Sequence, residues 1–302
     1  MMLWQLTEHE TAAVIIGVCF GVAARIMMLR TDYRQYPTHP HGKIIHLALG
    51  VIAAGLGAVA VPSLLSKNYT AITFLSLAAQ QFRDVRNMER QTLTQVDKME
   101  LVPRGTTYIE GIAMVFEGRN YLVIFSAFVS SLFGLLFEWY WGIAAGLLSL
   151  FVSKWFQSGK NLGQIAEIRT AEIRLDGPNL YVDSVYIMNI GLESDREVIA
   201  KHAMGMLVIP KNANVKVTIA NLGQRQAILH NMSTILGVYR DSGEPALLPM
   251  AKLDLNSGTL AVFLLPRVND EALALNVLSR VPVLENAIRL PSEFAGENSK
   301  EA

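Results

Sequence analysis

The chain has 302 residues, a formal net charge of zero and 17% charged side chains, against roughly 25% in a typical soluble domain. Its mean hydropathy is +0.31. The first 160 residues carry a small excess of basic side chains and the remainder a small excess of acidic ones. Neither part has the concentrated positive charge of a nucleic-acid-binding protein, so no nucleic-acid partner is expected.

The first apolar run predicts a membrane helix over Thr11–Leu29. About nineteen residues are enough to cross a bilayer, and Glu8 and Glu10 stand where a cleavable signal peptide needs basic residues. We therefore expect a retained helix. Cys19, the single cysteine, excludes an intramolecular disulfide and lies inside this run, where a buried and unreactive thiol is expected.

Further apolar segments follow in the first half of the chain. Those long enough to span a bilayer, or nearly so, are Ile44–Leu65, Tyr121–Phe137 and Trp141–Phe156. Tyr69–Phe82 is shorter, so it is either a span or an interfacial or re-entrant piece. The sequence therefore predicts an α-helical transmembrane bundle of about five helices over residues 1–160.

The basic residues favour the five-helix alternative. If the segment 69–82 spans, all clusters of lysine and arginine fall on one side of the membrane. These are Arg30, Arg34 and Lys43 after the first helix, Arg83 to Arg104 after the third, Arg119 before the fourth, and Lys154 and Lys160 after the fifth. If it does not span, two basic loops fall on opposite sides, which the positive-inside rule disfavours. We expect a membrane protein with its N-terminus outside and its C-terminal domain in the cytoplasm.

Small residues recur at four-residue spacing in the predicted helices. They are Gly17 and Gly21 in the first, Gly50 and Ala54 in the second, Ser126, Ser130 and Gly134 in the fourth, and Gly142 and Gly146 in the fifth. Such faces let helix backbones approach closely in lipid. Packing within one bundle is the favoured interpretation, and packing between subunits is the alternative. Arg25 follows on the Gly21 face, where its side chain is expected to snorkel to the interface.

Residues 106–118, ahead of the fourth span, predict an amphipathic helix lying at the cytoplasmic interface. Its apolar face carries Ile109, Ile112, Ala113 and Phe116. Glu110 and Glu117 lie on another face, where two carboxylates can bind a cation, line an ion path or pair with arginine. The favoured interpretation is a polar face that contacts headgroups, water or Arg119.

Within this helix, the string Tyr108-Ile109-Glu110-Gly111-Ile112-Ala113 resembles the signature of the YIEGIA family of membrane proteins from endospore-forming bacteria. Length and layout also agree with that family. The resemblance implies an inner-membrane protein associated with sporulation. It also implies a small partner described as a capping subunit. It carries over no catalytic residues.

From about Ile165, strand and helix signals alternate, which predicts a cytoplasmic α/β (α+β) domain over residues 161–290. A unit of two strands followed by a capped helix is predicted three times. The units are strands 173–175 and 180–190 with helix 194–203, strands 206–210 and 215–220 with helix 221–235, and strands 247–255 and 259–266 with a helix from Asn269 or Asp270 to 278. The polar tail, residues 291–302, is expected to be disordered.

Residues with catalytic or metal-binding chemistry do not form a recognisable constellation. His39, His41 and His46 have spacing that can hold a metal, but Asp32 is the only acidic residue nearby, so we expect neither a metal nor a cofactor. His202 and His230 are expected to be structural or surface residues on helices.

Three functions are open at this point. The first is a non-enzymatic, homo-oligomeric membrane assembly, a scaffold or a channel, whose cytoplasmic domain docks a small protein. The second is an ion channel or small-solute transporter using Glu110, Glu117 and Arg25. The third and weakest is a membrane-embedded enzyme with Glu110 or the loop histidines as acid–base groups, because nucleophile, base and orienting group cannot be named together.

Overall fold

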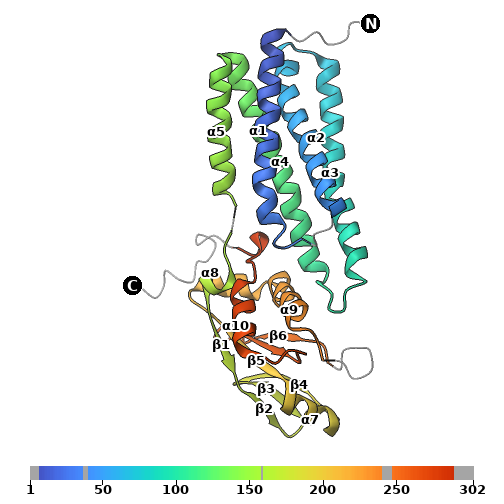
Figure 1. Cartoon of the computed structure of the whole chain (residues 1–302), viewed down its shortest axis with the longest axis vertical. Coiled ribbons are helices and arrows are strands. Elements are labelled where there is room, and N and C mark those ends of the chain that lie inside the picture. The colour runs from blue at the N-terminus through green and yellow to red at the C-terminus, as the bar shows by residue number, and fades with distance from the viewer. Residues whose placement is uncertain (1–6, 37–39, 158, 240–246, 289–302) are drawn as a thin grey trace. The chain divides into compact units, whose positions relative to one another are not determined.

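The chain divides into two compact units. The computed structural model describes residues 7–36, 40–157, 159–239 and 247–288 (Figure 1). The first unit comprises Met1–Gln91 and Ile112–Ser158, and the second comprises Thr92–Gly111 and Gly159–Ala302. The division falls inside two helices, α3 and α4, so the chain passes between the units there and again after α5.

Five long helices carry the first unit. They are α1 (Glu8–Asp32), α2 (Pro40–Leu65), α3 (Tyr69–Asp97), α4 (Thr106–Leu136) and α5 (Trp139–Trp155). Among the described residues, α1, α2 from Gly42 and α4 are long and apolar enough to cross a membrane, which confirms three of the five predicted spans as candidates. α5 has 17 residues, and α3 becomes polar in its second half.

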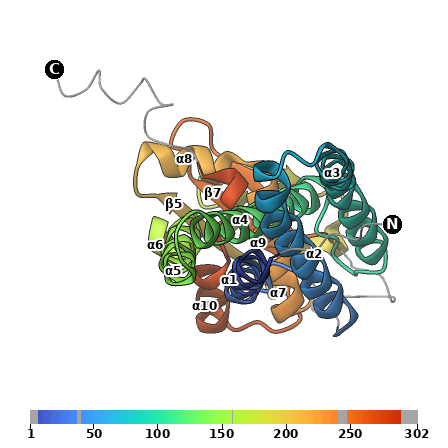
Figure 2. The same cartoon turned by 90° about the horizontal axis from the view of Figure 1, so that it is seen from above.

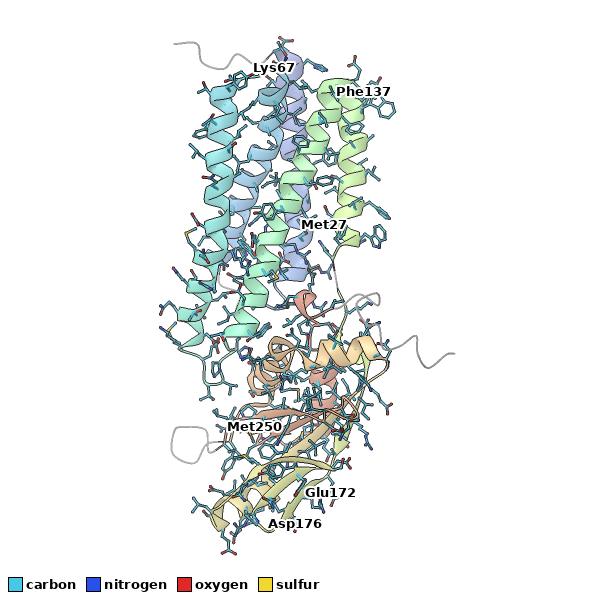
Figure 3. The ribbon with its side chains drawn as sticks, turned by 180° about the vertical axis from the view of Figure 1, so that it is seen from behind. Met27, Lys67, Phe137, Glu172, Asp176 and Met250 are labelled. Carbon is cyan, nitrogen blue, oxygen red and sulfur yellow. The ribbon has the colours of Figure 1, made fainter. Side chains whose placement is uncertain are left out.

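Successive helices of the bundle run in opposite directions. Lys67, between α2 and α3, and Phe137, between α4 and α5, lie at the same end (Figure 3). α1 packs against both α2 and α5 (Figure 2). The buried side chains at the centre are mostly small, namely Ala24, Ala53, Ala54, Ala58 and Ala127 with Met28 and Val123. Small side chains bring the backbones close together, which is how helices pack well in lipid.

The segment 106–118 is not a separate interfacial helix, as the sequence suggested. It is the first part of the single 31-residue helix α4. Ile112, Phe116, Val123 and Ala127 are all buried at helical spacing. Because one packing face continues across Gly118, no break in the helix is favoured there.

The second unit contains two antiparallel sheets. One has four strands in the order β1-β5-β7-β6, and the other has three strands in the order β2-β3-β4. The strands are β1 (Ala166–Ala171), β2 (Ile173–Asp176), β3 (Asn179–Val182), β4 (Val185–Asn189), β5 (Met204–Pro210), β6 (Met250–Leu253) and β7 (Leu260–Leu264). Helices cover one face of the larger sheet, and the smaller sheet with α7 (Glu193–His202) covers the other (Figure 1).

Burial on both faces explains the apolar central strands. Met206 and Val262 face the helices, whereas Leu207 and Phe263 face the smaller sheet. Successive residues of a strand point to opposite faces, so a sheet covered on both sides needs continuous rather than alternating apolar residues. The helices on the first face are α6 (Leu162–Ile165), α8 (Ala213–Ala220), α9 (Leu222–Leu236) and α10 (Glu271–Arg280), and η1 (Glu285–Ala287) follows.

The repeated hairpin–helix pattern is not confirmed. Residues 215–220, predicted as a strand, form most of α8, because the Asn212 side chain accepts a hydrogen bond from the Val215 N–H and caps the helix. Residues 180–190 divide into β3 and β4 at a turn in which Asp183 has φ of 56°. The third unit does have the predicted order, β6–β7 and then α10 capped by Asp270. The tail 291–302 lies outside the described residues.

Candidate functional site

Three charged side chains meet inside the helical bundle. Arg25 of α1 is fully buried, and its Nη1 lies 3.2 Å from Asp32 Oδ2 on the same helix. Arg119 of α4 is also buried, and its Nε lies 3.1 Å from Asp32 Oδ1. Asp32 therefore uses one carboxylate oxygen within α1 and the other to join α1 to α4. We refer to Arg25, Asp32 and Arg119 as the arginine–aspartate cluster.

Close backbone approach makes room for this cluster. A Cβ on Gly50 of α2 would lie 2.5 Å from Cγ of Arg25, so only glycine fits beside that side chain. The Arg25 guanidinium lies 4.9 Å from the centre of the Phe116 ring, a cation–π contact. Its Nε donates to the backbone carbonyl of His46 at 3.4 Å. Arg25 thus contacts α2 and α4 as well as its own helix.

A second polar contact joins α2 to α3. His46 Nε2 lies 3.8 Å from Glu89 Oε1, and both residues are buried. The His46 ring packs edge-on against Tyr36 and at a tilt against Phe116. Burial raises the pKa of the Glu89 carboxyl to about 7, and the positive charge of Arg25 opposes that rise. Glu89 lies beyond the apolar part of α3, so the His46–Glu89 contact occurs where that helix becomes polar.

Several buried polar atoms around the cluster have no hydrogen-bond partner among the described residues. They are Arg25 Nη2, His46 Nδ1, Tyr33 Oη and both polar atoms of the Asn120 amide. Buried polar groups are normally satisfied by protein or by ordered water. The arginine–aspartate cluster and the His46–Glu89 contact are therefore buried polar contacts with spare hydrogen-bonding capacity. Together they join α1, α2, α3 and α4.

The two carboxylates singled out in the sequence belong to different units. Glu117 Oε2 lies 3.3 Å from Arg86 Nη1 of α3, and the Tyr121 hydroxyl donates to Glu117 Oε1 at 3.4 Å. Glu110 is half-buried and falls in the second unit. Arg119 bonds to Asp32. The structure thus gives Glu117 an arginine partner, which was one of the alternatives weighed for it.

The signature segment starts inside the second unit. Tyr108 and Ile109 are buried, and the Tyr108 N–H donates to Gln226 Oε1 of α9 at 3.1 Å. A Cβ on Gly111 would lie 2.7 Å from the amide of Asn286 in η1. Tyr108 and Gly111 of the motif therefore contact α9 and η1. Ile112 and Ala113, also buried, belong to the first unit.

The connection from α3 to α4 is tied to the same helix. Asp97 accepts hydrogen bonds from the N–H groups of Arg104 at 2.6 Å and Gly105 at 3.1 Å. His230 of α9 donates from Nδ1 to the carbonyl of Val102 at 2.8 Å. Burial lowers the pKa of His230, so the neutral ring is the form that fits here. The α3–α4 connection is thus a folded part of the second unit.

The predicted helix-packing residues all lie buried in the bundle. They are Gly17, Gly21, Gly50, Ala54, Ser126, Ser130, Gly134, Gly142 and Gly146. Their close neighbours belong to the same chain: a Cβ on Gly21 would lie 2.6 Å from that of Ala54, and the Ser130 hydroxyl donates to the Gly142 carbonyl at 2.8 Å. The faces are occupied within one protomer.

The histidine cluster considered for a metal is only partly described. His46 contacts Glu89, whereas His39 and the side chain of His41 lie outside the described residues. In the part of the chain that the structure covers, no three histidine, cysteine or acidic side chains group together as metal ligands.

Two expectations about single residues were wrong. Arg25 does not snorkel, because it is fully buried and paired with Asp32. Cys19 is exposed on the outside of the bundle rather than buried. Sequence reasoning missed Asp32, Glu89 and Gln226 as partners. The available signal was the seven-residue spacing of Arg25 and Asp32, which places both on one helical face.

Comparison with known proteins identifies relatives. A sequence model of the family described as "YIEGIA protein" matches residues 13–294. A Bacillus subtilis (strain 168) protein named "Uncharacterized protein YphB" is 58% identical over 288 residues, covering 95% of this chain and 97% of that protein. No solved structure matches the chain significantly.

Proposed function

This chain belongs to the YIEGIA family, and from that premise we propose that it is a non-enzymatic membrane anchor for a protein-docking domain. In this proposal the helical bundle lies in the inner membrane with the N-terminus outside. The α+β domain lies in the cytoplasm, where it binds a small capping-type protein subunit during sporulation. The subunit and the link to sporulation follow from what family resemblance implies.

The observation that carries the proposal is how the two units are connected. The chain passes between them three times, inside α3, inside α4 and after α5. The family's signature residues Tyr108 and Ile109 are buried at the second of these passages. A domain that only needed to stay near a membrane would need one tether. Three tethers, one of them containing the signature, favour a role in which the domain is presented to a partner.

Two further features support five spans. α5 begins and ends with the exposed aromatic residues Trp139 and Trp155, as expected where a helix meets two membrane interfaces. Tyr69, Phe74 and Leu77 are exposed on the first half of α3, which suits a surface in contact with lipid.

The buried charges suit an anchor better than a transporter. Arg25, Asp32, Arg119 and Glu117 are engaged in ion pairs between or within helices. The proposal also includes self-association of the chain. The small-residue faces that suggested it are occupied within one chain, so subunits would have to meet through other surfaces.

The proposal is tested by co-purifying the full-length chain with the small capping-type subunit. We expect a complex with the wild type, less complex with Gln226→Leu, which removes the acceptor of the Tyr108 N–H, and normal complex with Tyr121→Phe. Failure of the wild type to form a complex at micromolar concentration would overturn docking. Ion flux into proteoliposomes that is abolished by Glu117→Gln would instead establish a transporter.

The orientation of the chain in the membrane is measured in cells that produce it with the Cys19→Ser substitution. A membrane-impermeant maleimide should label Lys67→Cys in intact cells and Arg34→Cys only after lysis. The reverse pattern would invert the proposed topology.

A further inference from the structure

A cavity of about 440 Å³ lies at one end of the larger sheet in the second unit. Ala166, the first residue of β1, pairs with Pro210, the last residue of β5. Both strands therefore meet at this end, where the chain enters β1 from α6 and leaves β5 for α8. The cavity lies between these connections.

Two lysines with fixed backbones line the cavity. The carbonyl of Lys160 accepts a hydrogen bond from the Val283 N–H at 3.0 Å, which holds Lys160 beside the segment after α10. The Lys211 ammonium donates to the carbonyls of Gln164 at 3.1 Å and Gly163 at 3.4 Å. An ammonium has three N–H donors. With two of these donors bound to carbonyls of α6, the positively charged Lys211 ammonium keeps a third N–H donor for a ligand.

The first turn of α8 adds neutral donors at the same place. Asn212 and Asn214 both line the cavity. Asn212 caps the N–H of Val215, but the N–H groups of Ala213 and Asn214 have no acceptor within the helix. Free N–H groups at a helix start favour anions.

Most of the remaining wall of the cavity is apolar. Ile165, Val215, Val283 and Ile288 line it beside the neutral polar residues Gln164 and Thr218, and none of the ten lining residues is acidic. A site with a cationic rim and an apolar wall suits an anion that carries a hydrocarbon part better than a bare inorganic ion.

Lys160 is only five residues along the chain from the end of α5. Trp155 and Phe156 at the end of α5 are strongly exposed aromatic side chains of the kind that sit at a bilayer interface. Lys160 follows Trp155 by five residues, and five extended residues reach at most about 17 Å. Lys160 therefore remains within reach of phospholipid headgroups.

We propose that this cavity binds a phosphate group through Lys160, Lys211 and the start of α8, and that the phosphate belongs to an anionic phospholipid. The lysines supply charge, the α8 N–H groups supply hydrogen bonds, and the apolar side chains contact the hydrocarbon part of the lipid. This site goes beyond the docking of a protein subunit, because it would hold the second unit against the bilayer whether or not a partner is present.

The test measures binding of a short-chain phosphatidylglycerol to the full-length chain in detergent. Phosphatidylcholine of the same chain length and inorganic phosphate are measured alongside it. Because a lysine near an anionic surface contributes about fivefold in affinity, Lys160→Gln should weaken phosphatidylglycerol binding about fivefold and Lys160→Gln/Lys211→Gln about 30-fold. Lys201→Gln, a lysine of α7 away from the cavity, should leave binding unchanged. Lys211→Arg keeps the charge and should retain most of it.

The outcomes separate the alternatives. The Lys160 side chain makes no hydrogen bond or ion pair among the described residues, so Lys160→Gln removes none. Equal phosphatidylglycerol binding by the wild type and by Lys160→Gln would overturn the site. Inorganic phosphate that binds as tightly as phosphatidylglycerol and is equally sensitive to Lys160→Gln would keep the phosphate site but overturn its assignment to lipid. If the wild type binds phosphatidylglycerol normally but forms no complex with the protein subunit, the docking proposal is refuted and this site is left intact.

Discussion

The helical bundle and the α+β domain bury polar groups in different ways. In the bundle, the buried polar centre is charged: Asp32 is shared between Arg25 and Arg119. In residues 159–239 and 247–288 of the α+β domain, the comparable residue is the neutral Gln224, whose amide donates to the Pro282 carbonyl at 3.2 Å and accepts from the Leu284 N–H at 2.8 Å. The buried ion pair of the second unit, Asp97 with Arg104, lies in the α3–α4 connection. The charged side chains of the bundle join helices, whereas the Gln224 amide satisfies backbone groups of Pro282 and Leu284.

The proposed locations of the bundle in lipid and of the α+β domain in water account for this difference. In water, burial of apolar side chains drives folding, and polar groups in the core need only be satisfied. In lipid that drive between helices is absent, so close packing of small residues and polar contacts between helices must fix their positions. The bundle has both features, in its alanine-rich centre and in its arginine–aspartate cluster.

The largest expected effect comes from Asp32→Asn. This change leaves Arg25 and Arg119 buried without their shared counter-charge, and breaking a buried ion pair in this way costs about 3–5 kcal/mol. Unfolding of the purified chain in detergent measures the loss. Glu138→Gln, which alters an exposed carboxyl at the start of α5, is the matched control and should unfold like the wild type. Equal stability of Asp32→Asn and wild type would show that the cluster does not hold the helices together.

An intermediate effect is expected from adding one methyl group to α2. A Cβ on Gly57 would overlap the carbonyl oxygen of Ile124 in α4, so Gly57→Ala should cost about 1–3 kcal/mol through overpacking. Gly55 is two residues away and faces open space. Gly55→Ala should therefore be neutral or stabilising, by about 0.5–1 kcal/mol, because alanine favours the helix. The same unfolding assay compares the two, and equal effects would argue against close α2–α4 packing.

The smallest effect concerns pH and the second unit. Because burial lowers the pKa of folded His230, the unfolded chain binds a proton more readily. The stability from neutral His230 is complete above the unfolded pKa near 6.5 and is lost as pH falls toward the folded pKa. The slope is at most about 1.4 kcal/mol per pH unit.

Hydrogen-exchange protection of α9 in the full-length chain, corrected for intrinsic rates, tests this between pH 7 and 5. His230→Gln should remove the dependence, and His9→Gln, a change at an exposed position on α1, should retain it. A wild type whose α9 protection does not fall with pH would contradict the role assigned to His230.

Local signals were sufficient for much of this fold. The apolar runs predicted α1, α2 and the second part of α4. Asn221 was identified as a helix cap from its position before an apolar periodic segment, and the cap of the last helix was narrowed to Asn269 or Asp270, of which Asp270 is the cap. Val215–Ala220 failed because its β-branched residues suggested a strand, whereas the cap from Asn212 favours a helix.

The site was less predictable because its partners come from different helices. Asp32 and Arg119 are 87 residues apart, and His46 and Glu89 lie on different helices. No local pattern reports such contacts. Glu117 was recognised as a candidate, but its partner Arg86 belongs to a helix whose membrane character was itself uncertain from the sequence.

The three passages of the chain between its units have a consequence for proteolysis. A single cut in the stretch after α5 would break the one covalent link between residues 159–302 and the preceding chain. Those residues would then be held by non-covalent contacts with the α3–α4 connection and the start of α4, including the hydrogen bonds of His230 with Val102 and of Tyr108 with Gln226. The domain can therefore stay in place after such a cut, and its release requires the loss of these contacts.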